Sequence, residues 1–330
     1  MAGGIGDAMI DIRTGDCQTI LPTLPDQSVH CCVTSPPYWG LRDYGMPEQL
    51  GMERSPEEYV DHMVGVFREV RRVLRDDGTL WLNLGDSYAS GGTGGASDKS
   101  GLCSGRGANP KLATCGNGNP RSLAPGLKPK DLVGIPWRVA FALQADGWYL
   151  RQDIIWHKPN AMPESVTDRC TKAHEYLFLL SKRERYFYDA EAVAETIAYP
   201  VPGGSARSGD YSIGSGRNDG GRHRSGGFVN TGGTRNRRSV WTVATKPYSE
   251  AHFAVYPPEL ITPCILAGCP MGGTVLDPFG GSGTTAEVAE ANGRNSIIIE
   301  LNPAYVNLAE QRTAQAGLFC QPLDDAPEIE

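Results

Sequence analysis

The stretch VLDPFGGSGTTAEVA, residues 275–289, predicts a strand, a glycine-rich turn and a helix in immediate succession. We expect the strand to end at Asp277 and the helix to begin at Thr284, where free amides of the helix N-terminus adjoin a turn that a ligand can approach closely. Another apolar strand, NSIIIE, follows this helix and ends at Glu300, 23 positions after Asp277. A carboxylate at that place can accept hydrogen bonds from both hydroxyls of a ribose.

Known nucleotide-binding turns differ from this one in their residues and spacing. A phosphate-binding P-loop needs Lys followed by Ser or Thr after its last glycine, whereas Thr284 and Thr285 follow Gly283 here. The dinucleotide fingerprint G-x-G-x-x-G does not fit the spacing either. We therefore predict a nucleoside ligand without a pyrophosphate; for the turn taken alone, a tight strand–helix connection with no ligand is the alternative.

The rest of the chain alternates apolar strands with amphipathic helices. Its 330 residues, 40% hydrophobic and 21% charged, suffice for one large α/β core with insertions or for two modest domains. The predicted strands are 29–34, 79–84, 152–156, 176–180, 274–276 and 296–299, and the predicted helices are 56–74, 131–146, 284–292 and 303–316. Strands that alternate with helices predict an α/β fold with a mostly parallel sheet.

Two segments rich in Gly, Ser, Asn and Arg, residues 89–127 and 200–238, interrupt this pattern. We expect long flexible loops, which act either as plain linkers or as basic loops that close around a phosphate backbone. The net charge of −7 argues mildly against a polyanionic partner, but positive charge concentrates within 205–246.

Composition also limits the cofactors and the compartment. The nine cysteines are scattered without CxxC pairs, so we predict reduced thiols and no metal site. No stretch combines the basic and apolar segments of a signal peptide or reaches the roughly 18 apolar residues of a membrane helix, so we expect a cytoplasmic protein without a membrane partner.

A second unusual stretch, TSPPYWG at residues 34–40, follows the strand 29–33 directly. Pro36 and Pro37 cannot donate hydrogen bonds to a neighbouring strand, so the sheet must end here. The carbonyl groups and aromatic rings of residues 34–40 must then face a group outside the sheet.

Together, TSPPYW and DPFGGSGTT resemble the amino-directed DNA methyltransferases that use S-adenosylmethionine, and the order of the two motifs is similar to that of the β group. The resemblance extends to most of the chain, including DGTLWLNLGDSY, WHKPNAMPESVTDRCTKAHEYLFLLSK and KPYSEAHFAVYPPELI. It implies a Rossmann-like methyltransferase fold with a mostly parallel seven-stranded sheet, one antiparallel strand and a circularly permuted motif order.

The resemblance also implies a cofactor site for S-adenosylmethionine. Asp277 and the glycine turn would lie at the methionine part, Glu300 at the ribose and Asp16 at the adenine amino group. The implied cofactor-binding residues are Asp16, Cys17, Thr34, Asp277, Pro278, Phe279, Gly280, Gly281, Ser282, Gly283, Thr284, Thr285, Glu300, Leu301 and Asn302.

The catalytic residues implied are Ser35, Pro36, Pro37 and Tyr38. The Ser35 hydroxyl and the Pro36 carbonyl would accept the two N–H bonds of an exocyclic amine, and Tyr38 would stack on a base flipped out of the duplex. Trp39 is expected to contact DNA, with a plain core aromatic as the alternative. Cys31 and Cys32 lie within a strand and are expected to be inert.

In the family, Ser before Pro-Pro usually accompanies cytosine-N4 targets, so Ser35 predicts that base. Adenine-N6 methylation and an inactive DNA-binding relative are the alternatives. Double-stranded DNA is the expected partner and a cognate restriction endonuclease a further candidate, while a monomer and a homodimer both stay open.

We expect residues 1–159 and 246–330 to form the catalytic and cofactor-binding domain and 160–245 to recognise the target sequence. The arginines expected to bind DNA are Arg222, Arg224, Arg235, Arg237 and Arg238. His157, Lys158, His174 and Glu175 are expected to be structural or to face DNA, because they lack the HExxH spacing of a metal site.

Overall fold

The structure is a computed structural model that describes residues 8–89, 126–196, 234–245 and 255–319. The larger parts of both predicted loops, residues 90–125 of the first and 200–233 of the second, lie outside the described residues. Among the helices of the described ranges, none is long and apolar enough to cross a membrane.

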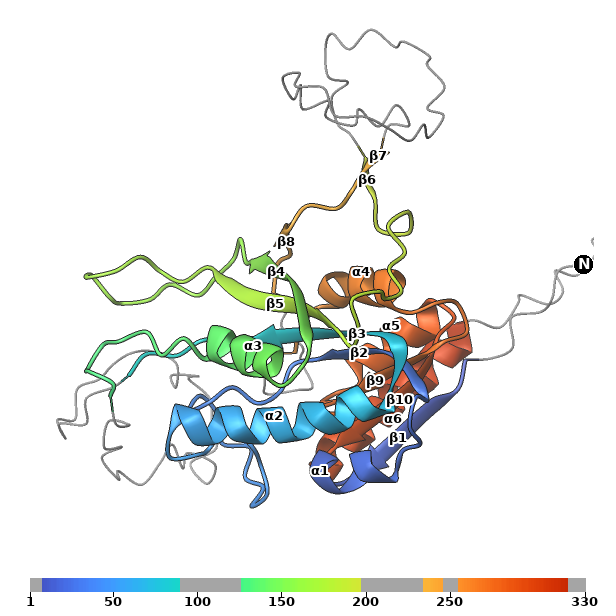
Figure 1. Cartoon of the computed structure of the whole chain (residues 1–330), viewed down its shortest axis with the longest axis horizontal. Helices are drawn as coiled ribbons and strands as arrows, with labels where there is room; N and C mark the ends of the chain where they lie inside the picture. Colours follow the sequence, from blue (N-terminus) through green and yellow to red (C-terminus); the bar gives the residue numbers. More distant parts are fainter. Residues whose placement is uncertain (1–7, 90–125, 197–233, 246–254, 320–330) are drawn as a thin grey trace, which may run out of the picture.

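One eight-stranded sheet crosses the molecule in the order β1-β10-β9-β2-β3-β5-β4-β8 (Figure 1). Every neighbouring pair is parallel except the two pairs that β5 makes with β3 and β4. The strands are β1 (Ile10–Thr14), β2 (Val29–Thr34), β3 (Leu74–Leu84), β4 (Tyr149–His157), β5 (His174–Ser181), β8 (Val240–Thr242), β9 (Thr274–Asp277) and β10 (Asn295–Glu300). The Rossmann-like α/β fold and the single antiparallel strand are therefore confirmed.

The predicted number of seven strands is wrong for this sheet, because β8 adds an eighth strand at its edge. β8 pairs with the end of β4, from Ile155 opposite Val240 to His157 opposite Thr242. A run of three residues is too short to show the alternation that identifies a strand. β1, at the opposite edge, was likewise absent from the predicted strands.

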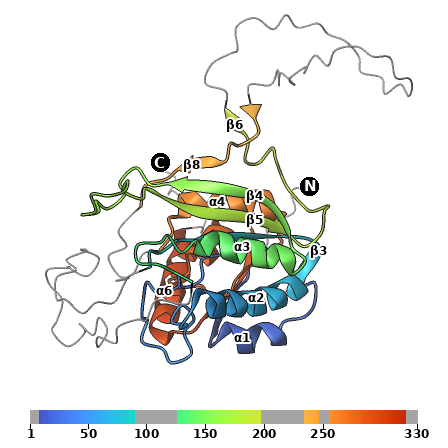
Figure 2. The ribbon, with the colours of Figure 1, turned by 60° about the vertical axis from the view of Figure 1, so that its left-hand side comes forward.

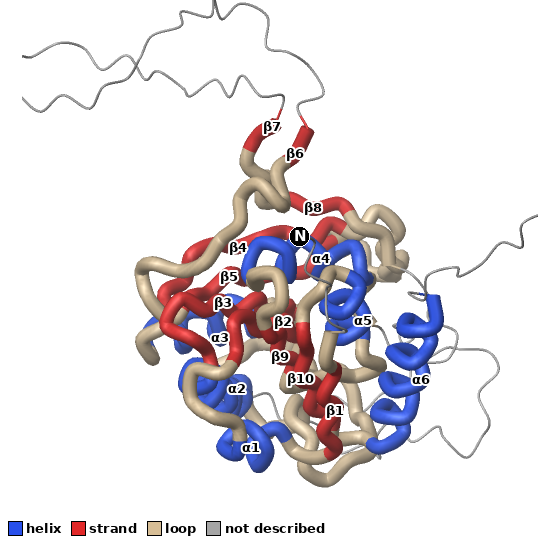
Figure 3. Tube along the Cα trace, turned by 90° about the vertical axis from the view of Figure 1, so that its right-hand side faces the viewer, coloured by secondary structure: helices blue, strands red, loops and turns tan. Residues whose placement is uncertain are grey.

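Helices cover both faces of the sheet (Figure 3). α1 (Cys17–Ile20), α2 (Pro56–Val73) and α3 (Ile135–Ala145) contribute side chains to one apolar core, whereas α4 (Pro258–Gly268) and α5 (Thr284–Ala291) contribute to the other. α6 (Pro303–Phe319) packs against α5 and the β1 edge. The four predicted helices are confirmed as α2, α3, α5 and α6, and α4 is additional.

Successive side chains of the central strands alternate between these two cores. Leu80 and Leu82 of β3 pack with α2 and α3, while Trp81 between them packs with α4. The Ser55 side chain fixes the start of α2 by accepting a hydrogen bond from the Glu58 amide at 3.2 Å. Both faces of the central strands β2, β3 and β9 are thus largely buried, so a ligand reaches these strands at their ends.

The predicted target-recognition region, 160–245, contributes both to this sheet and to a separate pair of strands. β5 lies inside the main sheet, so the expected boundary at residue 160 does not separate two folded bodies. β6 (Glu195–Thr196) and β7 (Thr234–Arg235) form a second, two-stranded sheet. Figure 1 and Figure 2 both show β6 standing away from the main sheet, beyond β8.

Candidate active site

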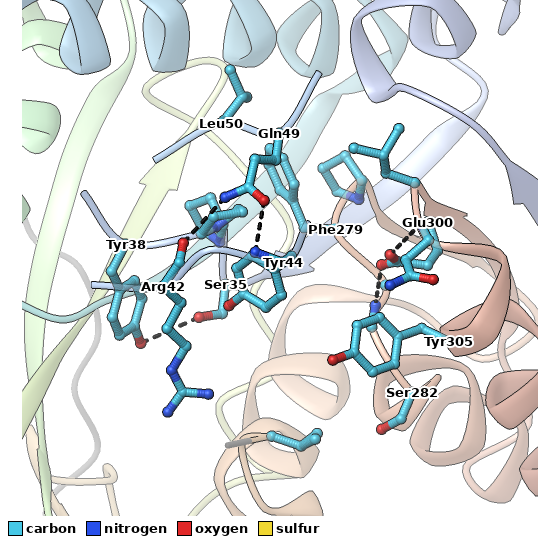
Figure 4. Close-up of a pocket in the computed structure, with 18 of the residues that line it drawn as sticks. Ser35, Tyr38, Arg42, Tyr44, Gln49, Leu50, Phe279, Ser282, Glu300 and Tyr305 are labelled. Atoms are coloured by element: carbon cyan, nitrogen blue, oxygen red, sulfur yellow. Dashed lines mark hydrogen bonds between the residues drawn. The ribbon is translucent and has the colours of Figure 1, made fainter. Parts of the chain in front are cut away.

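A cleft of about 390 Å³ lies at the carboxyl ends of β2, β9 and β10, and both sequence motifs line it (Figure 4). All four predicted catalytic residues and eleven of the predicted cofactor residues face this one space. They are Ser35, Pro36, Pro37, Tyr38, Asp16, Cys17, Pro278, Phe279, Gly280, Gly281, Ser282, Thr284, Glu300, Leu301 and Asn302. The chain thus brings together two motifs that are distant in sequence, as their positions at strand ends predicted.

Asp277 does not line the cleft; its carboxylate lies fully buried beneath it. One oxygen accepts hydrogen bonds from the Thr34 hydroxyl at 2.6 Å and from the Phe279 amide at 3.1 Å. The other accepts from the hydroxyls of Tyr256 at 2.8 Å and Thr285 at 2.6 Å. Burial raises the pKa of the Asp277 carboxyl, and these hydrogen bonds oppose the rise. Asp277 therefore links the end of β2 to the glycine turn, across 243 positions of sequence.

The glycine turn leaves no space for side chains at two of its positions. A Cβ at Gly280 would lie 1.9 Å from the Ile298 side chain, and a Cβ at Gly283 would lie 2.8 Å from Cβ of Ala309. Gly283 also has φ of +81°, which favours glycine. Gly283 and Thr285 are buried and, like Thr34 and Asp277, do not line the cleft.

Glu300, at the end of β10, has its carboxylate held in place by two backbone amides. One oxygen accepts from the Gly281 amide and the other from the Asn302 amide, each at 2.8 Å. Burial raises the pKa of Glu300, and the same amides oppose that rise. On the same cleft, the Asp16 carboxylate caps α1 by accepting from the Gln18 amide at 3.0 Å. Two fixed carboxylates beside a glycine turn suit the hydroxyl and amino groups of a nucleoside.

The other wall of the cleft carries a hydrogen-bonded cluster centred on Tyr38. The Ser35 hydroxyl donates to the Tyr38 oxygen at 3.3 Å, and that oxygen lies 2.8 Å from a Glu175 carboxylate oxygen and 3.0 Å from the Asn83 amide oxygen. A Cβ at Gly85 would lie 2.5 Å from the Tyr38 ring, so the ring packs directly on the backbone. Burial and the Glu175 charge raise the pKa of Tyr38, which therefore stays protonated.

Several cleft residues were not predicted. Asn83 could have been found, because it stands near the carboxyl end of a predicted strand. Tyr256, which donates to Asp277, was not among the residues that the resemblance implied for the cofactor site. Lys158 and Glu175 were expected to be structural or DNA-facing, and both line the cleft.

The chain between the proline turn and α2 also lines the cleft and was not predicted to do so. The Gln49 side chain holds this segment together by two hydrogen bonds to its backbone: it accepts from the Tyr44 amide at 2.6 Å and donates to the Arg42 carbonyl at 3.1 Å.

The residues predicted to bind DNA lie outside this cleft where they are described. Trp39 donates to the Glu53 carbonyl at 3.0 Å and packs against the core beside α2. Arg235 and Arg238 both contact one Glu195 oxygen, at 3.1 and 2.8 Å, and Arg237 lies over the Trp241 ring at 4.5 Å. Arg222 and Arg224 lie outside the described residues. The role of these arginines in DNA binding stays a prediction.

Within the described ranges, no group of three or more His, Cys, Asp or Glu side chains is placed to hold a metal ion. The thiols of Cys17, Cys31 and Cys32 are buried, and burial raises the pKa of all three, which suits inert structural cysteines.

The fold and this cleft define an α/β protein in which a nucleoside site adjoins a Ser-Pro-Pro-Tyr corner. The chain belongs to the DNA methylase family of N6 and N4 methyltransferases, whose model matches residues 29–311. It is 50% identical over 299 residues to the type II methyltransferase M.Cfr9I of Citrobacter freundii, covering 90% of this chain and 85% of the relative. It is 46% identical over 301 residues to M.SmaI of Serratia marcescens, covering 91% and 89%. The predicted resemblance to amino-directed DNA methyltransferases is confirmed.

Solved structures share the fold as well. PvuII DNA methyltransferase, named as cytosine-N4-specific, superposes with a TM-score of 0.60 at 18% identity, covering 97% of this chain and 89% of that one. TTHA0409 of Thermus thermophilus, solved in complex with S-adenosyl-L-methionine, superposes with a TM-score of 0.54 at 22% identity, covering 93% and 95%.

Proposed function

We propose that this chain transfers a methyl group from S-adenosylmethionine to the exocyclic N4 of a cytosine that is flipped out of double-stranded DNA. The observation that carries the proposal is that the Ser35 corner and the glycine turn line one cleft and are joined beneath it by Asp277. A site for the amine and a site for a nucleoside cofactor are therefore adjacent. The family match and the type II relatives support the same activity.

The cleft residues fit S-adenosylmethionine. Glu300 would accept the ribose hydroxyls, Asp16 the adenine amino group, and the backbone of the turn from Phe279 to Gly281 would lie against the methionine part. The closeness of Ile298 to Gly280 explains why the turn itself carries no side chain there. When bound, the cofactor supplies an electrophilic methyl group on a sulfonium sulfur.

The chain's own residues prepare the amine. The nitrogen of cytosine N4 is a weak nucleophile because its lone pair is conjugated with the ring. If the Ser35 hydroxyl and the Pro36 carbonyl accept its two N–H bonds, the nitrogen can become tetrahedral and direct its lone pair along the transfer axis. Pro36 and Pro37 hold the corner rigidly. The rate enhancement would therefore come mainly from alignment of the amine with the methyl group.

Access to this corner requires base flipping, because an amino group inside the duplex cannot reach a cleft at the end of a sheet. The Tyr38 ring has the Gly85 backbone beside it and lines the cleft. Its packing keeps the ring in place for an extruded base to stack on.

Cytosine is proposed over adenine because, in the family that the chain resembles, a Ser before Pro-Pro usually accompanies cytosine-N4 targets, and Ser35 occupies that position. The name of the PvuII neighbour is consistent with this choice. Expression in a host that lacks DNA methylation, followed by mass spectrometry of its nucleosides, should yield N4-methylcytosine. Finding N6-methyladenine in its place would contradict the choice of base, and finding neither would contradict the activity.

The catalytic assignment is tested separately. Ser35→Ala and Tyr38→Ala should keep cofactor binding in a calorimetric titration and lose transfer of label from tritiated cofactor. Undiminished turnover in both variants would reject the assignment.

Recognition of the target sequence is proposed for residues 160–245. The two arginines at the β6–β7 pair support this, because phosphate contacts need local positive charge. A cognate restriction endonuclease is proposed as a partner from the type II names of the relatives. Single-molecule sequencing of the modified host DNA would give the recognition sequence, and DNA modified at that sequence should resist the endonuclease.

A further inference from the structure

A chain of hydrogen bonds leads from the Ser35 hydroxyl to a carboxylate inside the cleft. Ser35 donates to the Tyr38 oxygen at 3.3 Å, and Tyr38 donates to Glu175 at 2.8 Å. The second Glu175 oxygen forms an ion pair with Lys158, and both side chains are 18% exposed. Lys158 also lies over the Trp156 ring at 4.2 Å. The chain of donors and acceptors therefore begins at the proposed amine site and ends at a partly buried carboxylate that is paired with Lys158.

The direction of this chain is set by its neighbours. The Asn83 side-chain nitrogen donates to the Tyr176 carbonyl at 3.0 Å, which turns its oxygen towards Tyr38. The Tyr38 hydrogen thus has two acceptors, and Glu175 is the closer and the charged one, which makes the stronger bond. The raised pKa of Tyr38 means that its hydroxyl can release a proton to Glu175 only as it receives one from Ser35.

We propose, resting on the proposed function, that Glu175 is the final proton acceptor of methyl transfer and that Ser35 and Tyr38 carry the proton to it. The amine nitrogen forms a bond to the methyl carbon, and the carbon–sulfur bond breaks with its electron pair going to sulfur. The nitrogen then carries a positive charge and loses one N–H proton to the Ser35 oxygen, and the electron pair of that bond returns to nitrogen. The Ser35 proton moves to Tyr38, the Tyr38 proton moves to Glu175, and Glu175 becomes a neutral acid.

Lys158 has a distinct role in this scheme. Its ammonium group pairs with the Glu175 carboxylate before transfer and stays beside it afterwards, when the acid is neutral. Because both side chains line the cleft, the acid can return its proton to solvent once the product has left. The Ser35–Tyr38 distance of 3.3 Å is long for two hydroxyl groups, and such bonds shorten when a substrate orders the site.

The test compares Glu175→Gln with Glu175→Ala in single-turnover methylation of a duplex. Glutamine keeps an oxygen that accepts the Tyr38 hydrogen bond but does not take up a proton. We expect both variants to be slower by about 100-fold or more, the range of acid–base catalysis, with dissociation constants for cofactor and DNA within about threefold of the parent. A structural role for Glu175 would instead leave Glu175→Gln close to the parent and impair Glu175→Ala alone.

Two further variants secure the result. Tyr38→Phe keeps the ring and breaks the chain, so it should be as slow as Glu175→Gln, and the double variant should be no slower than the worse single one. Glu69→Gln removes a similar carboxylate from its pair with Arg72, outside the cleft, and should leave the rate unchanged.

Near-parent rates in Glu175→Gln or Tyr38→Phe, or additive losses in the double variant, would overturn the relay while leaving the proposed function intact. If the unmodified protein methylates adenine, the relay still stands and only the proposed choice of cytosine is contradicted. A parent with no transfer overturns both proposals.

Discussion

The link between the two motifs can be tested at Thr34, the residue that connects β2 to Asp277. Thr34→Val replaces the hydroxyl by a methyl group of similar size, so it removes a 2.6 Å hydrogen bond to a buried carboxylate without opening a cavity. A hydrogen bond to a charged group contributes about 1.5–3 kcal/mol, so we expect the free energy of unfolding to fall by about 2 kcal/mol. That is a large part of the total of about 5–15 kcal/mol for a folded domain.

The assay is urea unfolding followed by both tryptophan fluorescence and circular dichroism, because coincident curves justify a single free energy of unfolding. Thr313→Val is the matched control: this buried hydroxyl donates at 2.9 Å to the Ala309 carbonyl within its own helix, a neutral and local bond that contributes about 1 kcal/mol or less. If the two variants lose the same free energy, the Asp277 link does not hold the motifs together.

The same variant makes a prediction about pH. Burial raises the pKa of Asp277 above its usual 3.8, so its ionised form is disfavoured in the folded protein, whereas the bond from Thr34 favours that form. The part of the bond's contribution that depends on the charge of Asp277 is therefore present above the raised pKa of Asp277 and is lost as pH falls through it. The difference between parent and Thr34→Val should shrink from about 2 kcal/mol at pH 8 towards about 1 kcal/mol on acidification, as a charged acceptor becomes neutral. A difference that grows with acidity would refute this account.

Three other predictions concern the cleft and the β6–β7 pair. Gly85→Ala places a methyl group about 2.5 Å from the Tyr38 ring, so methyl transfer should fall by about 100-fold while calorimetry shows unchanged cofactor binding; an unaffected rate would mean that the ring can move freely. Glu300→Gln keeps the size of the side chain but sets an amide nitrogen against a backbone N–H, and should weaken cofactor binding at least about tenfold in the same titration, whereas parent-like affinity would remove Glu300 from the ribose site. If Arg235 and Arg238 contact phosphates, changing both to Gln should reduce the slope of log affinity against log salt by roughly 0.9 per lost contact, and an unchanged slope would retire both as DNA contacts.

The sequence by itself determined the architecture of the core and the position of the cleft. The apolar runs that became β2, β3, β9 and β10 were recognisable, and so were the glycines and prolines that end two of them. Because parallel strands place their carboxyl ends at one edge of a sheet, motifs at those ends had to meet, although more than 240 positions separate them.

Only the tertiary structure decided which side chains work together at that edge. Glu175 stands at the amino end of β5, and β5 is the antiparallel strand, so its beginning lies at the edge where its neighbours end. A rule about the carboxyl ends of parallel strands therefore does not predict that Glu175 lies at this edge. Asp277 was recognised as a key residue, but its burial and its four bonding partners depend on the register between distant segments. Local patterns fix where strands begin and end, whereas hydrogen-bond partners are fixed by packing in three dimensions.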